Sequence, residues 1–161
     1  MKEIILTKGQ VALVDDADYE WLMQWKWHVH KSGGGFYAVR AEWDGEKQHI
    51  VHMSRVILDA PRGKEVDHKN HCTLDNRRCN LRICTKSQNQ HNQIKQKRST
   101  SSVYKGVYWD RGGNRWQSRI KINGHSIYLG NFCSESEAAL IYNDAAIKYH
   151  GEFAKLNEVK R

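Results

Sequence analysis

A polar, basic and serine-rich stretch, NQIKQKRSTSSVYK, interrupts the chain of 161 residues and has no apolar periodicity. This composition predicts a linker, which we place at residues 94–102, and its lysines could follow a phosphate backbone. A chain of this length can bury one modest core or two small ones, because units of fewer than about 70 residues are marginally stable. Two small modules, residues 1–93 and 103–161, are therefore expected.

The first part of the chain alternates between strand-like and helix-like patterns. A short apolar strand and an acidic turn precede a stretch in which Tyr19, Leu22 and Met23 recur at helical spacing. Two β-branched and aromatic runs follow at residues 33–43 and 47–58, and the Asp-Gly turn between them predicts a β-hairpin. We therefore expect a small sheet with one helix. Three tryptophans are assigned to its core, with stacking on nucleic-acid bases as the alternative: Trp21, Trp25 and Trp27.

The middle of the chain predicts a strand, a long loop, a second strand and a helix. Residues 64–68 and 81–84 have strand character, and the twelve residues KNHCTLDNRRCN form the loop between them. Thr85 and Gln88 are a capping pair for the helix that follows. About 30 residues bury little apolar surface alone, so this unit must pack on the sheet that precedes it.

Two adjacent residues of the first of these strands, Asp67 and His68, are suited to phosphodiester cleavage. Histidine is a natural general base near neutral pH, and carboxylate and amide oxygens are natural ligands of magnesium. Consecutive strand residues point to opposite faces, so the imidazole and the carboxylate would be separated. Asn89, in the first turn of the helix, could point back to the strands and share a metal ion with Asp67.

From about residue 52 to residue 92 the chain resembles the HNH endonucleases, whose site is a ββα-metal unit. The segments DHKN, DNRRCNLR and SQNQHN carry the resemblance, which is closer to phage and mobile-intron members than to zinc-containing ones. It implies that Asp67 and Asn89 hold Mg²⁺ or another divalent cation such as Mn²⁺. It further implies that His68 is the general base and that Asn80 braces the loop.

Further polar residues around this unit either support the site and contact phosphate, or are structural and solvated residues. They are His52, Asn76, Arg77, Arg78, Arg82, His91 and Asn92. A zinc site built from His71 and the nearby cysteines is disfavoured, because the spacing offers no second short Cys pair, and no zinc is expected. Cys79 and Cys84 are interpreted instead as small buried groups flanking the second strand.

The last part of the chain predicts a three-stranded antiparallel sheet packed on one helix. Three short strands in residues 103–132 are joined by Asp-Arg-Gly-Gly and Asn-Gly turns. The helix begins after Ser134, with Glu137 completing a capping box, and ends at Gly151. Its apolar stripe is expected to contain Ala138, Ile141, Tyr142, Ala145 and Tyr149. The fold class of the whole chain is therefore predicted as α+β.

The outer face of this sheet is expected to be polar and basic. Strand alternation turns Trp116, Ser118 and Ile120, together with Ile127 and Leu129, toward the helix. The residues expected outward or at the turns, as DNA contacts, are Lys105, Tyr108, Arg111, Arg115, Gln117, Arg119, Lys121, Ser126 and Tyr128. A sheet with outward Arg and Lys suits the major groove of DNA, and the alternative is an ordinary solvated face.

The same segment resembles the Apetala-type, or ethylene-response-factor, DNA-binding domain along nearly its whole length. Gly-Val on the first strand, YLGNF on the third, the EAA…YNDAA…HGE helix and the closing LN carry the resemblance. Members of that family lay the sheet in the major groove, which implies double-stranded DNA as the partner. Four outward positions depart from the family's arginine and tryptophan pattern, so the target sequence does not carry over: Tyr108, Asp110, Ser126 and Tyr128.

Charge and cysteine content are typical of a protein that acts inside a cell. The formal net charge is +8, with the basic excess after residue 60, which a polyanionic partner and a generally basic surface explain equally well. No apolar run approaches a membrane span, and the first residues are too polar for a signal peptide. Free thiols in a reducing compartment are expected, which favours the cytoplasm of a bacterial or phage-infected cell.

These features together predict a DNA endonuclease of homing type, a monomer or a homodimer, with one active site per chain. The main alternative is a non-enzymatic, sequence-specific DNA-binding regulator with a degenerate HNH unit, which needs no metal. RNA as the substrate fits less well, because the deep and narrow major groove of RNA does not admit a sheet.

Overall fold

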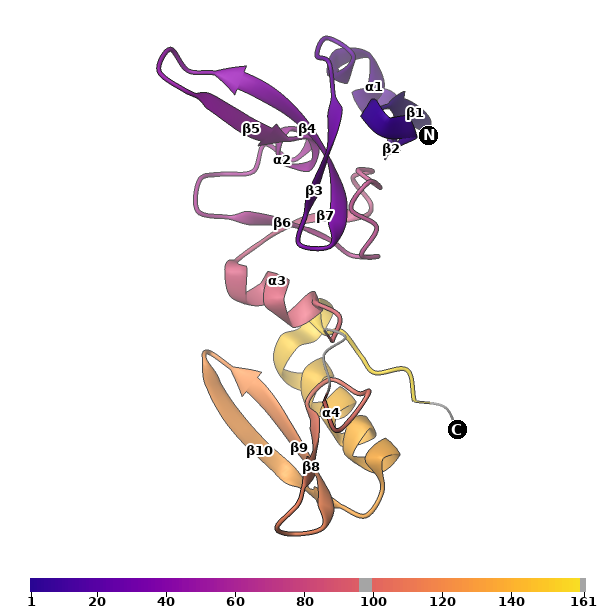
Figure 1. Ribbon diagram of the computed structural model, residues 1–161, viewed down its shortest axis with the longest axis vertical. Coiled ribbons are helices and arrows are strands. Elements are labelled where there is room, and N and C mark those ends of the chain that lie inside the picture. The colour runs from indigo at the N-terminus through magenta and orange to yellow at the C-terminus, as the bar shows by residue number, and fades with distance from the viewer. Residues whose placement is uncertain (96–99, 160–161) are drawn as a thin grey trace. The chain divides into compact units, whose positions relative to one another are not determined.

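The chain divides into two compact units, Met1–Lys86 and Ser87–Arg161 (Figure 1). The computed structural model describes residues 1–95 and 100–159. Within them, small antiparallel sheets combine with four α-helices, so the protein is a mixed α and β protein. The division falls before the predicted linker at 94–102, and residues 96–99 of that linker lie outside the described residues.

The first unit is built from three small antiparallel sheets and two helices. The sheets pair β1 with β2, β3 with β4 and β5, and β6 with β7. The elements are β1 (Lys2–Ile5), η1 (Thr7–Gly9), β2 (Val11–Val14), α1 (Asp16–Leu22), β3 (His28–Ser32), β4 (Gly35–Trp43), β5 (Gln48–His52), α2 (Met53–Ile57), β6 (Glu65–His68) and β7 (Leu81–Cys84). The predicted hairpin, strands 64–68 and 81–84, and the loop between those strands are confirmed.

One hydrophobic core holds these sheets together. Val14, Leu22 and Met53 are fully buried in it, and Leu81 brings β7 into the same cluster. The three tryptophans are part of this core as predicted, since Trp27 is buried and the other two pack against the cluster. Packing against this core is what stabilises a strand–loop–strand unit that has few apolar residues of its own.

Two expectations for the first unit are wrong. The run 47–58 is not a single strand, because β5 ends at His52 and residues 53–57 form α2. Met53 and Ile57 are four residues apart and both buried, which is the spacing of a helix rather than of a strand. Met23 follows α1 as its C-cap and is exposed, so it does not share the buried side of that helix.

The second unit consists of a three-stranded antiparallel sheet in the order β10–β9–β8, the covering helix α4 and the short helix α3. Its elements are α3 (Lys86–Asn92, of which Lys86 is counted with the first unit), β8 (Val107–Asp110), β9 (Arg115–Ile122), β10 (His125–Phe132), α4 (Glu135–His150) and η2 (Gly151–Phe153). Ser134 caps α4 by accepting a hydrogen bond from the Glu137 amide, as the capping box predicts. Gly151 ends the helix with a positive φ of 54°.

The buried stripe of α4 differs from the predicted one at its C-terminal end. Ala138, Tyr142 and Ala145 are buried as expected, whereas Tyr149 is 47% exposed. The buried residues that complete the stripe are Ala139, Ala146 and His150. An α-helix has 3.6 residues per turn, so residue 150 lies on the same side of the helix as Ala146, four residues earlier, whereas residue 149 does not lie in the buried stripe.

Candidate active site

Asp67 and His68 lie at the end of β6, where β7 pairs with it in antiparallel register. Asp67 is opposite Arg82, and His68 is opposite Leu81. Both residues are buried, with exposed fractions of 5% and 6%. Arg82 binds Oδ2 of Asp67 through Nε at 2.8 Å and Nη2 at 2.7 Å. This arginine therefore holds the carboxylate in place across the strands, and phosphate contact by Arg82 stays a prediction.

The imidazole of His68 is oriented by the loop between β6 and β7. Its Nε2 lies 3.4 Å from Oδ1 of Asn76, and that oxygen can only accept, so the contact favours the tautomer protonated on Nε2. The lone pair is then on Nδ1. Burial lowers the pKa of His68, against the opposing effects of the Asn76 hydrogen bond and of Asp67 and Asp75. A lowered pKa keeps the ring neutral at pH 7, as a general base requires.

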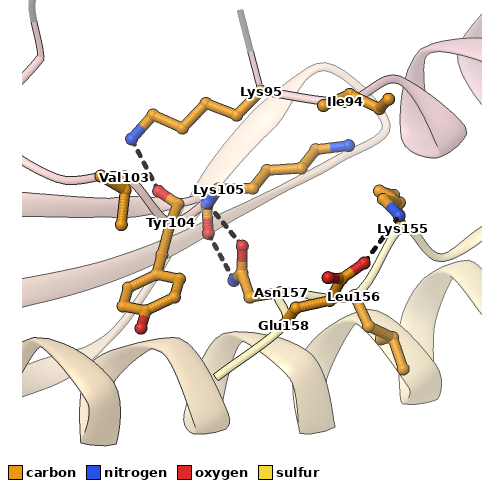
Figure 2. Close-up of a pocket in the computed structure, with 9 residues that line it drawn as sticks. All are labelled: Ile94, Lys95, Val103, Tyr104, Lys105, Lys155, Leu156, Asn157 and Glu158. Atoms are coloured by element: carbon orange, nitrogen blue, oxygen red, sulfur yellow. Dashed lines mark hydrogen bonds and ion pairs between the residues drawn. The ribbon is translucent and has the colours of Figure 1, made fainter. Parts of the chain in front are cut away.

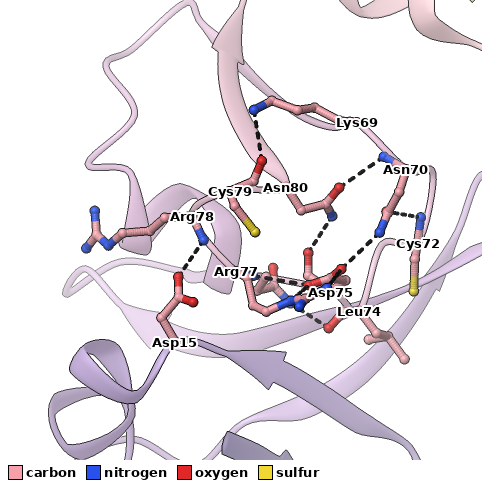
Figure 3. Close-up of polar contacts among 11 residues, drawn as sticks. Asp15, Lys69, Asn70, Cys72, Leu74, Asp75, Arg77, Arg78, Cys79 and Asn80 are labelled. Atoms are coloured by element: carbon pink, nitrogen blue, oxygen red, sulfur yellow. Dashed lines mark hydrogen bonds and ion pairs between the residues drawn. The ribbon is translucent and has the colours of Figure 1, made fainter. Parts of the chain in front are cut away.

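Asn80 joins the two ends of this loop (Figure 3). Its side-chain Oδ1 accepts a hydrogen bond from the Asn70 amide at 3.0 Å, and its Nδ2 donates to the Asp75 carbonyl at 2.8 Å. Asn80 is buried, with 6% of its surface exposed. These two bonds connect segments that a twelve-residue loop would otherwise leave independent.

The arginines of the loop are engaged by carboxylates. Arg77 binds Asp75 through Nε and Nη2, both at 2.7 Å, and this ion pair lowers the pKa of Asp75. Arg78 forms two bonds to Asp18 on α1, at 2.8 and 2.7 Å. Each of these arginines therefore stabilises the loop through an ion pair, while the Arg78 side chain is still 52% exposed to solvent. Phosphate binding by Arg77 stays a prediction, and it requires Arg77 to contact a phosphate group while it also binds Asp75.

Backbone hydrogen bonds attach the loop to β2. The Leu13 amide donates to the Leu74 carbonyl at 2.9 Å, and the Asn76 amide donates to the Leu13 carbonyl at 2.8 Å. Asn76 is also buried, with 2% of its surface exposed. Its backbone amide binds β2, and its side chain contacts His68. The residue that contacts His68 thus has a rigid position relative to the core.

His52 ends β5 and precedes α2, and the ring of Tyr37 lies near both His52 and His68. The Tyr37 ring is 5.5 Å from the His52 ring and 6.4 Å from the His68 ring, both edge-on. Burial lowers the pKa of His52, and His30, Arg55 and His68 act in the same direction. His52 is therefore a neutral, partly buried neighbour of the site at pH 7.

Asn89, His91 and Asn92 lie on α3, and contacts assign this helix to the second unit. Asn92 is buried, and the His91 ring stacks on the His150 ring at 3.6 Å. Burial, with His150 and Lys105, lowers the pKa of His91 to about 4. The first unit therefore brings together Asp67, His68 and Asn80, whereas Asn89 belongs to the second unit, which contains the β8–β9–β10 sheet.

The donor set proposed for a metal consists of oxygen atoms. A carboxylate and an amide carbonyl are the ligands that Mg²⁺ and Mn²⁺ prefer, so Asp67 and Asn89 fit such an ion chemically. Among residues 1–95 and 100–159, no group of three or more His, Cys, Asp or Glu side chains is placed to hold a metal ion. Cys84 is buried as expected, but Cys79 is exposed, so it is not a small buried group.

The outer face of the β8–β9–β10 sheet has the predicted alternation on β9. Ser118 and Ile120 are buried against α4, whereas Arg119 and Lys121 are exposed. Across the strands, Arg119 faces Tyr128, Lys121 faces Ser126, and Gln117 faces Tyr108. Arg119 Nε donates to Gln117 Oε1 at 2.6 Å. The exposed side chains on this face thus form one continuous polar surface with two tyrosines.

Some expectations for this sheet need correction. Lys105 precedes β8 instead of lying on it, and its ammonium group donates to the carbonyl oxygens of His91 and Gln93. Ile127 is 39% exposed although it pairs with the buried Ile120, because it lies on β10, an edge strand of the sheet. Arg111 lies in the exposed turn after β8, and Arg115 begins β9.

Comparison with known proteins identifies the family. The HNH endonuclease family model matches residues 59–91, a range that includes Asp67, His68, Asn80 and Asn89. The Uncharacterized HNH endonuclease L560 of Acanthamoeba polyphaga mimivirus is 33% identical over 153 residues, which are 94% of this chain and 77% of that protein. The chain belongs to the HNH endonuclease family.

The C-terminal part of this HNH endonuclease is similar to plant proteins. APETALA2-like protein 2 of Oryza sativa subsp. indica is 45% identical over 60 residues, which are 37% of this chain and 14% of that protein. The AP2-like ethylene-responsive transcription factor TOE2 of Arabidopsis thaliana is 44% identical over 62 residues, 38% of this chain and 13% of that protein. The chain thus spans only a small part of these plant relatives.

Two side chains of the HNH endonuclease site were not predicted from the sequence. Tyr37 reaches the histidines from β4, a strand whose sequence suggested only a hairpin. Asp75 is 2% exposed and connects the loop through Asn70 and Arg77. The acid inside the basic run LDNRRCN was the available signal for Asp75, since a carboxylate close to arginines is suited to an ion pair.

Among the described residues, no helix is long and apolar enough to cross a bilayer.

Proposed function

We propose that this HNH endonuclease is a homing-type enzyme that hydrolyses phosphodiester bonds of double-stranded DNA with a divalent cation, preferably Mg²⁺. The observation that supports it most is the buried pair at the end of β6, where His68 is kept neutral by burial and is oriented by Asn76. A rigid, neutral imidazole beside a buried carboxylate combines a proton acceptor with an oxygen ligand for a cation.

In the proposed reaction, neutral His68 takes a proton from water as the water oxygen attacks phosphorus in line with the leaving 3′ oxygen. The P–O3′ bond breaks with its electron pair on the 3′ oxygen, which takes a proton from solvent water, and this gives 5′-phosphate and 3′-hydroxyl ends. Asn80 keeps the loop closed, so that Asn76 holds the imidazole in one orientation. This positioning lowers the entropic cost of reaching the reactive geometry.

Asp67 and Asn89 are the residues that would hold the metal ion. When bound, the ion supplies positive charge that stabilises the scissile phosphate and the leaving oxygen. Arg82 fixes the Asp67 carboxylate and reduces the negative charge at the end of β6, which favours the approach of a phosphate group.

The outer face of the β8–β9–β10 sheet is proposed to lie in the major groove. Its exposed Arg119 and Lys121 can reach base edges and phosphates, and Tyr108 and Tyr128 supply stacking or apolar contacts. With one catalytic histidine per chain, a monomer would nick one strand, and a double-strand break would require a homodimer or two visits.

Cleavage of a supercoiled plasmid library, with and without magnesium, tests this function. We expect wild-type chain to give open circles or linear DNA only with the metal, and His68→Ala to give none. His49→Ala is the matched control, because His49 lies on an exposed hairpin and contacts Asp44 instead of the site. If wild-type chain binds duplex DNA but leaves it uncut with Mg²⁺ and Mn²⁺, the protein acts as a DNA-binding regulator instead.

A further inference from the structure

The helix that carries Asn89 is too short and too polar to be stable alone. α3 has seven residues, Lys86–Asn92, and all of their side chains are polar. Isolated helices of fewer than about 12 residues are marginal in water even when their sequences are favourable. The position of α3 must therefore be set by its contacts, and within the second unit these contacts involve Lys105 and His150.

Lys105 binds the C-terminal end of α3. Its Nζ donates to the His91 carbonyl at 2.6 Å and to the Gln93 carbonyl at 2.8 Å. The last carbonyl groups of a helix have no partner within the helix, and they form the negative end of its dipole. The Lys105 ammonium group donates hydrogen bonds to these carbonyl groups and places a positive charge at the negative end of the dipole. Lys105 therefore acts as a C-terminal cap supplied from another segment.

The backbone of Lys105 is itself fixed to α4. Its amide donates to Asn157 Oδ1 at 2.7 Å, and its carbonyl accepts from Asn157 Nδ2 at 3.1 Å (Figure 2). Asn157 and Asn143 of α4 exchange a second pair of hydrogen bonds, at 2.7 and 2.9 Å. The next residue, Gly106, accepts a backbone hydrogen bond from Arg119 of β9. The cap on α3 is thus connected rigidly to both layers of the recognition unit.

A second connection joins α3 to the sheet through two histidines. The His91 ring lies 3.6 Å from the His150 ring, with an angle of 8° between their planes. His150 Nε2 donates to the carbonyl of Lys121 at 3.0 Å, and the side chain of Lys121 is on the outer face of the sheet. α3 is therefore connected, through His150 of α4, to the strand that is proposed to enter the DNA groove.

Lys95 adds a third connection, on the segment that follows α3. Its Nζ donates to the carbonyl groups of Ser102 and Tyr104, at 2.8 and 2.6 Å. Lys95 and Lys105 both line a cavity of about 330 Å³ (Figure 2). Lys105, after the linker, thus binds carbonyl groups that precede it, and Lys95, near the start of the linker, binds carbonyl groups at its end and just beyond it.

We propose that Lys105 is a positioning residue for cleavage: by capping α3 it fixes Asn89 relative to the recognition sheet, so that DNA bound on the sheet sets where the metal ligand stands. The inference rests on the proposed function, because it takes Asn89 as a metal ligand. It gives Lys105 a role that differs from the DNA contact expected from the sequence, since both of its bonds go to protein carbonyls.

The test uses the full chain with Lys105→Met, which keeps an unbranched apolar side chain of nearly the same length and removes the ammonium group. Lys105→Arg is the conservative rescue, and Lys148→Met is the control for loss of one positive charge on exposed α4 surface. Three quantities are measured: hydrogen exchange of the amides of residues 86–93, affinity for a duplex selected by the wild-type chain, and the Mg²⁺ dependence of cleavage at saturating DNA.

For Lys105→Met we expect faster exchange across α3 and DNA affinity within about twofold of wild type. The Mg²⁺ concentration for half-maximal cleavage should rise by about 10-fold or more, as is usual for residues that support metal ligands. Lys105→Arg should restore most of both effects, and Lys148→Met should show neither.

Three outcomes would overturn the inference. Unchanged exchange in residues 86–93 would show that Lys105 does not anchor α3, whatever the activity. Weaker DNA binding with a salt dependence reduced by about one ion, and unchanged cleavage at saturating DNA, would make Lys105 a phosphate contact. An uncut substrate with wild-type chain would remove the proposed function itself, and the positioning role with it, even if α3 proved to be anchored.

Discussion

Asp67 and Arg82 form a buried ion pair directly across β6 and β7, with Oδ2 of the acid 2.7 Å from Nη2 of the arginine. Only 6% and 11% of the two side chains are exposed. Breaking a buried pair by removing one partner leaves an uncompensated charge and costs about 3 to 5 kcal/mol. We expect Arg82→Met to lower the free energy of unfolding by about 3 kcal/mol, measured by urea denaturation. Arg62→Met, at an exposed position, should change it by less than about 0.5 kcal/mol.

The same variant tests whether Asp67 is a metal ligand. A cation that binds the folded chain and not the unfolded chain stabilises it by mass action. Arg82→Met removes the cation that contacts Oδ2 of Asp67, so Mg²⁺ should compete for this carboxylate more readily, and millimolar Mg²⁺ should stabilise this variant more than the wild type. If Mg²⁺ stabilises Arg82→Met and the wild type equally, Asp67 is not a ligand. The same follows if Mg²⁺ stabilises the Arg82→Met/Asp67→Asn double variant as much as it stabilises Arg82→Met.

Much of the first unit could be predicted from the sequence, because the signals there are local. The Asp-Gly turn and the strand runs around Asp67 and Leu81 are patterns of neighbouring residues, and the structure has them. The ion pair of Arg78 was missed for a different reason. Arg78 meets Asp18, a residue 60 positions earlier, and no local pattern indicates which of several acids will lie beside a given arginine.

The contacts of α3 could not be predicted for a similar reason. Its sequence predicts a helix, but a polar helix can pack on either side of a linker, and composition alone suggested the boundary at residues 94–102. In the structure, His91 contacts His150, and Lys105 binds the His91 carbonyl. Both join residues far apart in the sequence, and neither involves the apolar periodicity on which a helix prediction depends.

Arg119 is the side chain for which DNA binding makes the clearest prediction. It is exposed on β9, opposite Tyr128, and Gln117 orients its guanidinium. An arginine that reads a base edge contributes about 1 to 3 kcal/mol, so Arg119→Met should weaken binding to a selected duplex by roughly 10-fold or more. Lys148→Met, on the helix that covers the opposite face, should bind nearly as well as wild type in the same fluorescence-anisotropy titration. Equal losses in both variants would indicate only a general effect of charge.

His52 predicts a dependence of stability on pH. Burial lowers the pKa of His52 in the folded chain below its usual value of 6.5. As the pH falls through 6.5, His52 therefore becomes protonated in the unfolded chain before it does so in the folded chain. Stability should therefore be fully present above pH 6.5 and fall as the pH is lowered toward 5. His52→Gln removes this linkage, so it should lose less stability between pH 7 and 5 than the wild type loses. Parallel pH curves for the two proteins in urea denaturation would contradict this, and His125→Gln, at an exposed position, is the control.

Gly106 and Gly124 separate the effect of backbone strain from the effect of a close contact. Both have a positive φ, 76° and 85°, so an alanine is strained at either position. A Cβ on Gly106 would lie 2.1 Å from Cδ2 of Tyr142 and 2.6 Å from the carbonyl oxygen of Arg119, whereas a Cβ on Gly124 would meet nothing within 4 Å. Gly124→Ala should cost about 1 kcal/mol, the penalty of a left-handed conformation.

Gly106→Ala should cost at least about 2 kcal/mol more, because Tyr142 is buried in a well-packed core and the contact with the Arg119 carbonyl involves backbone. Melting temperatures of the two variants, measured by thermal unfolding, would report this difference. Gly106 also follows the residue that caps α3, so hydrogen exchange in residues 86–93 should rise in Gly106→Ala and stay unchanged in Gly124→Ala. Equal melting temperatures for the two variants would show that the close approach of Gly106 to α4 does not contribute to the stability of the recognition unit.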